Sequence, residues 1–348
     1  MVRRSVILSL LGFPWVAWAQ KNQSCFDRFD RCFSSSGGGP SLDYNFLSGA
    51  LPAAVNFSRA SSGTYFDASG TLQTASTNVA RFDHNPNTLA AVGLLIEESR
   101  TNLLLNNTTL STQTVTVTAQ AYTLSFYGTG TVVLSGAFVG TLAGSGAFPT
   151  RSTLTFTPSA GALICTVTGT VSYGQIEAGS FATSVIITAG ASATRAVDVA
   201  TLPTSAFAFN ASVGSWAIQF QKAYASYYPG ILDMTDGTNN NLQGQYINNS
   251  DNKLSFQAKV SNAYTISTIP SGVVSYGTTQ RSAYSWSGST VKNTLNGAAP
   301  SSGTGALPSG LTTILFGNDQ GNYVNGWIAR VRYWPRALSS AELQTVTT

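Results

Sequence analysis

The acidic side chains of this sequence are too dispersed for the chemistry that paired carboxylates perform. Hydrolysis of a glycosidic bond uses two carboxylates that flank the bond, and alternate acids along one strand would place both on one face. Residues 201–348 hold five acids, and none stands in that pattern: Asp233, Asp236, Asp251, Asp319 and Glu342. Asp233 and Asp236 border a predicted turn, and Glu342 belongs to a predicted helix cap.

The only histidine does not suggest a nucleophilic triad. His84 stands in Asp83-His-Asn-Pro86, a turn-like run where we expect a solvated loop histidine. Glu97 and Glu98 are adjacent, so on a strand they point to opposite faces. The sequence therefore predicts a protein without enzymatic activity.

Signals for metal binding are equally sparse. The three cysteines, Cys25, Cys32 and Cys165, are too few and too scattered for a disulfide framework or a zinc site. Cys165 is typical of a small buried strand residue. Calcium takes several oxygen ligands, and Asp236 and Asp319 are the candidates for such a site, with solvated turns as the alternative. We expect no cofactor apart from this calcium alternative.

Sugar recognition suits the remaining aromatic and amide side chains, because rings stack on sugars and amides bond to hydroxyls. The alternative is that Trp216, Trp286 and Trp327 fill a core and that the asparagine run is only a turn. Both interpretations stay open at this point. The candidate sugar-binding residues lie around predicted turns: Tyr227, Tyr228, Asn239, Asn240, Asn241, Tyr246 and Trp286.

The composition limits the class of protein. Only 9% of the 348 residues are charged, against about 25% in typical soluble domains, so Ser, Thr, Asn, Gln and Gly must provide the polar surface. The formal net charge of +4 is spread thinly, without the dense basic block or the interleaved aromatics that nucleic-acid binding uses. We expect no nucleic-acid partner. The length fits two or three domains.

Short alternating segments between Gly, Ser, Thr and Asn turns predict the elements that position these residues. Turn signals recur about every 10 residues, which is typical of antiparallel β-sandwiches. Examples of the predicted strands are residues 115–117, 122–127, 131–134, 152–156, 163–167 and 216–220.

The C-terminal end carries the most detailed local prediction. Residues 325–334 read as a strand in which strict alternation cannot turn Ile328, Val331 and Tyr333 inward together, so we predict a bulge near Ala329 and Arg330. Pro335 should end this strand. The run Ser339-Ser-Ala-Glu342 predicts a capping box that opens a single helical turn.

The N-terminal segment, residues 1–33, supports two interpretations. Arg3 and Arg4 precede an apolar run that ends in Ala17-Trp-Ala19, which is typical of a secretory signal. The alternative is an uncleaved anchor that docks on a partner and continues as a short amphipathic helix. A Ser/Gly-rich linker over residues 34–43 follows. The candidate anchoring residues are Phe26, Phe29 and Phe33.

Three passages resemble virion proteins of tailed phages. The first comprises residues 57–72, Ala80-Arg-Phe-Asp83 and residues 93–103, and is similar to a signature of tail-fibre and head-spike proteins. The second, residues 175–184 with Thr194-Arg-Ala-Val-Asp198, resembles the closing strand of a carbohydrate-binding-module-like sandwich. The third, residues 316–343, resembles the end of a concanavalin A-like (laminin G-like) lectin domain.

The resemblance implies an all-β chain of tandem antiparallel β-sandwiches, the last a concanavalin A-like jelly roll, behind a short N-terminal helical or anchor segment. The implied regions are a virion signature region (44–106), a carbohydrate-binding-module-like sandwich (107–200) and a lectin domain (201–348).

The same resemblance implies a function. The chain would be a homotrimeric tail-fibre or head-spike subunit of a virion, attached to other virion proteins through its N-terminal segment. Its lectin domain would bind a host surface glycan. The alternatives are a purely structural decoration protein of the virion, and a secreted or periplasmic lectin-like protein with a cleaved signal peptide.

Overall fold

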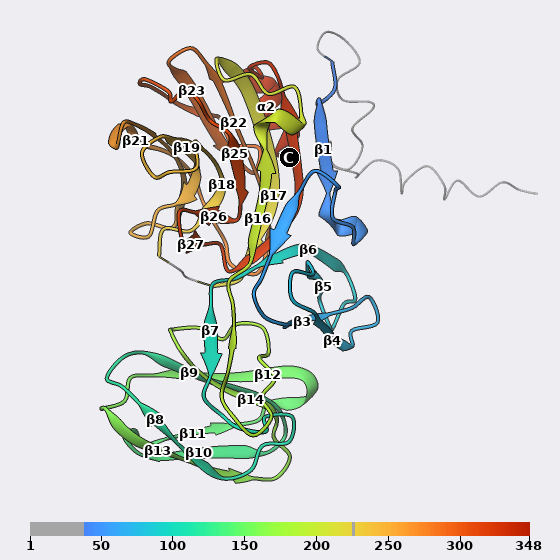
Figure 1. Cartoon of the computed structure of the whole chain (residues 1–348), viewed down its shortest axis with the longest axis vertical. Coiled ribbons are helices and arrows are strands. Elements are labelled where there is room, and N and C mark those ends of the chain that lie inside the picture. The colour runs from blue at the N-terminus through green and yellow to red at the C-terminus, as the bar shows by residue number, and fades with distance from the viewer. Residues whose placement is uncertain (1–37, 225–226) are drawn as a thin grey trace, which may run out of the picture.

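The computed structural model describes residues 38–224 and 227–348. Besides two short 3-10 turns (η1, Phe46–Ser48; η2, Thr204–Ala206) and one α-helix, the elements described are β-strands. They form a larger sandwich in the upper part of Figure 1 and a smaller one in the lower part. The predicted all-β sandwich fold is confirmed. The predictions for residues 1–33, including Phe26, Phe29 and Phe33, lie outside the described residues.

The larger sandwich consists of two antiparallel sheets. In the first sheet the order is β24-β23-β22-β17-β28-β6-β5, with β1 also beside β28. Its strands are β1 (Leu42–Asn45), β5 (Phe82–His84), β6 (Ala91–Ile96), β17 (Val213–Lys222), β22 (Thr279–Ser287), β23 (Thr290–Leu295), β24 (Ser301–Thr304) and β28 (Gly326–Trp334).

In the second sheet the order is β2-β16-β25-β18-β19-β20-β21. Alternation turns every second side chain toward the first sheet: in β20, Leu254, Phe256 and Ala258 enter the core, so Gln257 lies on the outer face. The strands are β2 (Asn56–Ser58), β16 (Val199–Pro203), β18 (Gly230–Thr235), β19 (Leu242–Ile247), β20 (Lys253–Val260), β21 (Ala263–Val273) and β25 (Thr313–Phe316).

Segments far apart in the sequence complete the larger sandwich. Strand β28 pairs with β17 on one side, and on the other with β6 and β1, so that Leu42 lies opposite Tyr333 and Leu95 opposite Trp327. Strand β2 pairs with β16. Four strands from residues 42–96 therefore belong to the same two sheets as residues 199–334.

The smaller sandwich packs a four-stranded sheet (β11-β10-β13-β8) on a three-stranded one (β12-β9-β14). Its core contains Cys165, which is fully buried as predicted. Its strands are β8 (Gln113–Val117), β9 (Tyr122–Gly128), β10 (Thr131–Gly136), β11 (Gly140–Ala143), β12 (Gly146–Phe156), β13 (Gly161–Thr168) and β14 (Ser172–Ala178).

The smaller sandwich is an insertion in the larger one. The chain leaves through β7 (Arg100–Asn102) and returns through β15 (Ala193–Arg195), and these two strands pair with each other, Asn102 opposite Ala193. Figure 1 shows β7 running between the two sandwiches. A separate hairpin of β3 (Gly63–Phe66) and β4 (Leu72–Ala75) lies near this junction.

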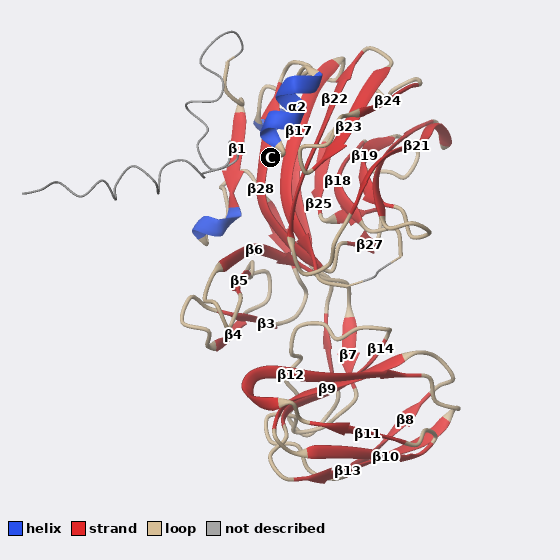
Figure 2. Cartoon of the chain, turned by 180° about the vertical axis from the view of Figure 1, so that it is seen from behind, coloured by secondary structure: helices blue, strands red, loops and turns tan. Residues whose placement is uncertain are grey.

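The predicted bulge, strand end and capping box at the C-terminal end are confirmed, whereas the predicted helix length is not. The register between β17 and β28 shifts because Gln219 pairs with Arg330 and Phe220 with Ile328, which leaves Ala329 as the bulge. Strand β28 ends at Trp334. Helix α2 (Ser340–Val346) opens with the predicted capping box but runs for seven residues, longer than the single turn expected. It packs on the outer side of the first sheet (Figure 2).

Two very short strands, β26 (Asn318–Asp319) and β27 (Asn322–Tyr323), form a small ladder beside β18. Gly230 of β18 makes this approach feasible, because a Cβ at that position would lie 2.3 Å from the Asp319 nitrogen. Within the described parts of the chain, no helix is long and apolar enough to cross a membrane.

Candidate functional site

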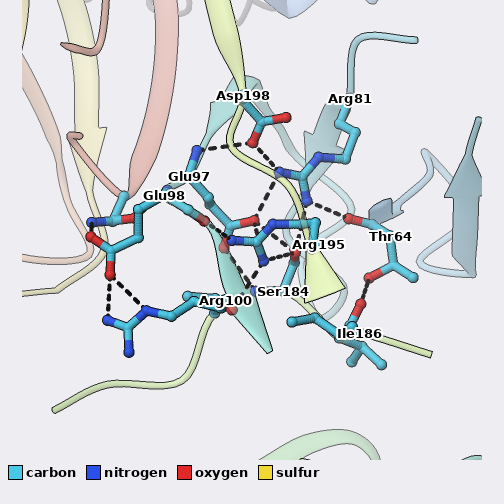
Figure 3. Close-up of polar contacts among 12 residues, drawn as sticks. Thr64, Arg81, Glu97, Glu98, Arg100, Ser184, Ile186, Arg195 and Asp198 are labelled. Atoms are coloured by element: carbon cyan, nitrogen blue, oxygen red, sulfur yellow. Dashed lines mark hydrogen bonds and ion pairs between the residues drawn. The ribbon is translucent and has the colours of Figure 1, made fainter. Parts of the chain in front are cut away.

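Five charged side chains meet in a buried cluster where the two sandwiches join. Figure 3 shows four of them, Arg81, Glu97, Arg195 and Asp198. Arg81 forms ion pairs with Glu97 (2.9 Å) and with Asp198. Arg195 contacts the same Glu97 carboxylate at 3.1 Å, and Arg59 contacts Asp198 at 3.2 Å. Each of these side chains is at most 6% exposed, and Glu97 alone among the five lines a neighbouring cavity.

The cluster also fastens the smaller sandwich. Ser184, which follows β14, donates its N–H and its hydroxyl to Glu97 at 2.8 and 2.7 Å (Figure 3). The first and second passages of the phage-protein resemblance supply every member: Arg59, Arg81, Glu97, Ser184, Arg195 and Asp198. We therefore interpret these residues as a structural joint.

Lowering the pH should weaken this joint, because it protonates the Glu97 carboxylate. Burial would raise its pKa, but Arg195, Arg81 and Ser184 together lower the pKa of Glu97 from 4.5 to about 2. A depressed carboxyl pKa stabilises the fold above pH 4.5, and that contribution disappears as pH falls from 4.5 to 2. We expect the difference in free energy of unfolding between wild type and Glu97→Gln, measured in urea, to shrink by roughly 3 kcal/mol as the pH falls from 4.5 to 2. A difference that does not change with pH would contradict this interpretation.

A cavity of about 360 Å³ adjoins the cluster, between the β3–β4 hairpin and the two sandwiches. Its charged side chains are already hydrogen-bonded: Asp83 accepts from the Phe66 N–H at 2.6 Å and from Trp327 Nε1 at 2.9 Å, and Arg151 donates to two oxygen atoms. His84 is half-buried at the end of β5, with Nδ1 3.2 Å from the Phe66 carbonyl oxygen. It is therefore not the solvated loop histidine that we expected.

A second cavity, of about 400 Å³, opens on the outer face of the second sheet. Three predicted sugar-binding residues and the predicted calcium candidate Asp319 line it together. We call it the tyrosine pocket, and its lining residues are Tyr227, Tyr228, Tyr246, Gln257, Tyr264, Ser267, Asp319 and Asn322.

Three of the four tyrosines, Tyr227, Tyr228 and Tyr246, form a connected row of rings. The ring of Tyr228 lies 6.1 Å from that of Tyr246 on β19 and 4.7 Å from that of Tyr227, the latter pair nearly perpendicular at 84°. Tyr227 and Tyr264 are 69% and 57% exposed. Two aromatic rings are thus available at the pocket for stacking on a ligand.

Two acidic side chains lie near this pocket, at different depths. Asp319 lines it and accepts a hydrogen bond from Gln257 Nε2 at 2.7 Å. Burial raises the pKa of Asp319 above its ordinary value, while Gln257 and Lys259 oppose the shift. Asp233 is fully buried within β18, so its predicted place at the border of a turn is wrong. Burial, and then Asp319, raise the pKa of Asp233 well above its ordinary value.

The asparagine run forms the turn after β18. Asn239 accepts from Lys259 Nζ through its carbonyl oxygen (3.1 Å) and its side chain (3.3 Å), while Asn241 donates to Asp236 at 2.8 Å. The Asn240 carbonyl accepts from the N–H of residue 262. These contacts hold the turn itself, and none of the four residues 236 and 239–241 lines the tyrosine pocket.

The tryptophan candidate lies in the core. Trp286 is 0% exposed, packs beside Tyr284 and Tyr333, and donates Nε1 to the Ala211 carbonyl at 2.9 Å. Its ring is therefore not accessible to a ligand on the surface. Trp216 is also fully buried.

Four pocket residues escaped the sequence analysis: Gln257, Tyr264, Ser267 and Asn322. Alternation in residues 253–259 was the available signal for Gln257, because apolar residues 254, 256 and 258 place the intervening ones on the opposite face. Over the described residues, no group of three or more His, Cys, Asp or Glu could hold a metal ion.

Residues 195–344 match a family model described as the concanavalin A-like lectin/glucanases superfamily. Similar solved structures include the Ruminococcus gnavus IT-sialidase CBM40 bound to α2,3-sialyllactose (18% identity; 39% of this chain and 82% of that one; TM-score 0.33). Another is domain 4 of AbnA, a GH43 extracellular arabinanase from Geobacillus stearothermophilus, in complex with arabinotriose (14% identity; 44% of this chain and 73% of that one; TM-score 0.37). A third is the heptameric SAP-like pentraxin of Limulus polyphemus (15% identity; 40% of this chain and 70% of that one; TM-score 0.29). No curated protein matches the chain.

Proposed function

We propose that this chain is a glycan-binding subunit of a virion appendage and that the tyrosine pocket holds the glycan. The pocket carries the proposal: four tyrosines, one carboxylate, two amides and a hydroxyl surround a cavity of about 400 Å³. Aromatic rings stack on the apolar faces of sugars. Asp319, Gln257 and Asn322 can bond to sugar hydroxyls and so orient the ligand.

The proposal assigns binding to this pocket, without hydrolysis. Glycosidases canonically place two carboxylates on either side of the scissile bond. Asp319 lines the pocket, whereas Asp233 is covered, so the lining residues present a single carboxylate to a ligand. The proposal also includes no cofactor, because Asp236 lies outside the pocket and Asp319 alone is a single carboxylate, whereas calcium takes several oxygen ligands.

Glycan binding is testable with the whole chain on an array of soluble bacterial and host oligosaccharides. Replacing the exposed Tyr264 with alanine should weaken binding about tenfold or more, because exposed aromatic rings of this kind commonly dominate recognition. The matched control is Tyr276→Ala, which removes a ring that is 44% exposed and outside the pocket. A blank array, or equal affinities for the two variants, would contradict the proposal.

The virion part of the proposal rests on the three passages that resemble virion proteins of tailed phages, the first of which is similar to a tail-fibre and head-spike signature. In it, the chain forms a homotrimer, its N-terminal segment attaches to other virion proteins, and the larger sandwich faces outward. Electron microscopy of particles labelled with an antibody against the larger sandwich tests this location. Particles without label, alongside processed chain in the culture medium, would favour the secreted alternative.

A further inference from the structure

The tyrosine pocket has an uneven balance of charge. Its lining includes the Asp319 carboxylate, and none of its eight lining residues is a lysine or an arginine. The amides of Gln257 and Asn322 and the hydroxyls of the tyrosines and Ser267 carry no charge. A ligand in the pocket therefore meets a negative group with no positive group in the lining to balance it.

The nearby cation, Lys259, is already committed. Its ammonium donates to the carbonyl and side-chain oxygens of Asn239 at 3.1 and 3.3 Å. It also lies 5.2 Å from the centre of the Tyr264 ring, where a cation–π contact holds it. Lys259 is only 7% exposed. At most two of its three N–H donors are engaged by these bonds, but its low exposure leaves a ligand carboxylate little access to the third.

A second acid stands behind the first on the same side of the sheet. Asp233 lies opposite Gly244 in the β18–β19 ladder, and Gly244 lies opposite Gln257 in the β19–β20 ladder. A Cβ on Gly244 would lie 2.1 Å from Asp233 Oδ1, so the glycine makes room for this carboxyl group. Neither oxygen of Asp233 has a hydrogen-bond partner in the described structure. An anion nearby would make ionisation of Asp233 harder still.

We infer that the tyrosine pocket selects uncharged and amine-bearing sugars and rejects sugars that carry a carboxylate or a sulfate. This inference rests on the proposed function and names the class of glycan for the same pocket. A protonated sugar amine can form a charge-assisted hydrogen bond to Asp319. An acidic sugar would bring a like charge into a partly desolvated site, and such juxtaposition is a strong negative determinant of specificity.

The test uses the whole chain on pairs of oligosaccharides in which one member is uncharged and the other carries acidic or amine groups. Suitable pairs are cellotetraose against the β-1,4-glucuronate tetramer, lactose against 3′-sialyllactose, and the N-acetylglucosamine tetramer against its deacetylated form. The uncharged member should bind about tenfold more tightly than its acidic counterpart, and the deacetylated member more tightly than the acetylated one. Both preferences should weaken between 20 and 500 mM salt, because screening shortens the range of the Asp319 charge.

The variant Asp319→Asn identifies the residue responsible. An asparagine oxygen can still accept from Gln257 Nε2, so the variant removes the charge while keeping the contact. It should bring acidic and uncharged members within about threefold of each other. The control is Asp236→Asn, on an exposed turn outside the pocket, which should leave the preference unchanged.

The outcomes separate this inference from the proposed function. Equal or tighter binding of acidic glycans, or a preference that survives in Asp319→Asn, would overturn the inference and leave glycan binding standing. Absence of binding to every member of every pair would overturn both.

Discussion

Replacing Arg81 with methionine is expected to lower the free energy of unfolding by about 3–5 kcal/mol. Methionine fills a similar volume but leaves Glu97 and Asp198 buried without the cation that they share. A domain of ordinary stability has only about 5–15 kcal/mol in total. We therefore expect a large fall in the urea midpoint, measured by far-UV circular dichroism.

The matched control removes an exposed pair. Lys253 lies 3.3 Å from Asp251, and the two side chains are 42% and 40% exposed, so Lys253→Met should change stability by less than about 1 kcal/mol. Loss of less than about 1 kcal/mol in Arg81→Met as well would show that the buried cluster is not the joint that we describe.

A fragment of residues 201–348 is expected not to fold cooperatively, although it spans the whole predicted lectin domain. Without β1 and β6, strand β28 loses its partners on one side, and β16 loses β2. The fragment also lacks the five large buried apolar side chains that residues 42–96 contribute to the larger core: Leu42, Phe46, Val55, Leu94 and Ile96. Each such side chain contributes about 1.5–3 kcal/mol on burial, so their joint loss rivals the stability of a whole domain.

Calorimetry and size-exclusion chromatography test this expectation. The comparison is a chain of residues 38–348, which retains every described strand and should unfold in cooperative transitions. The fragment should aggregate or show no transition, because strand β28 would become an exposed apolar edge. A sharp calorimetric transition from a monodisperse fragment would mean that β1, β2 and β6 are dispensable.

Local patterns predicted the elements well because each depends on neighbouring residues. Period-two alternation identified strands, the crowding of three apolar residues identified the bulge at Ala329, and Ser339 with Glu342 identified the helix cap. The pairing of strands depends on residues that are distant in the sequence. Nothing near Leu42 indicates that its partner is Tyr333, 291 positions away. Insertion of one sandwich in another therefore could not be read from the sequence.

The same limit explains the candidate site. Tyr227, Tyr228 and Tyr246 were found because they are aromatic residues clustered around predicted turns, and they do converge. Trp286 was misleading, because its residue type suits a core as well as a sugar site and only the fold decides between them. Tyr264 escaped because its relation to Asp319 depends on two ladders that meet only in the folded protein.

The paired strands β7 and β15 have a consequence for how this chain could change over time. Asn102 and Ala193 face each other across one antiparallel ladder. The Cα atoms at the two ends of the inserted segment therefore lie only about 5 Å apart. A different domain with closely spaced termini could be inserted between β7 and β15 without repacking the two sheets of the larger sandwich. The smaller sandwich could thus be replaced by another domain, provided that the new domain supplies a partner for Glu97 where Ser184 now lies.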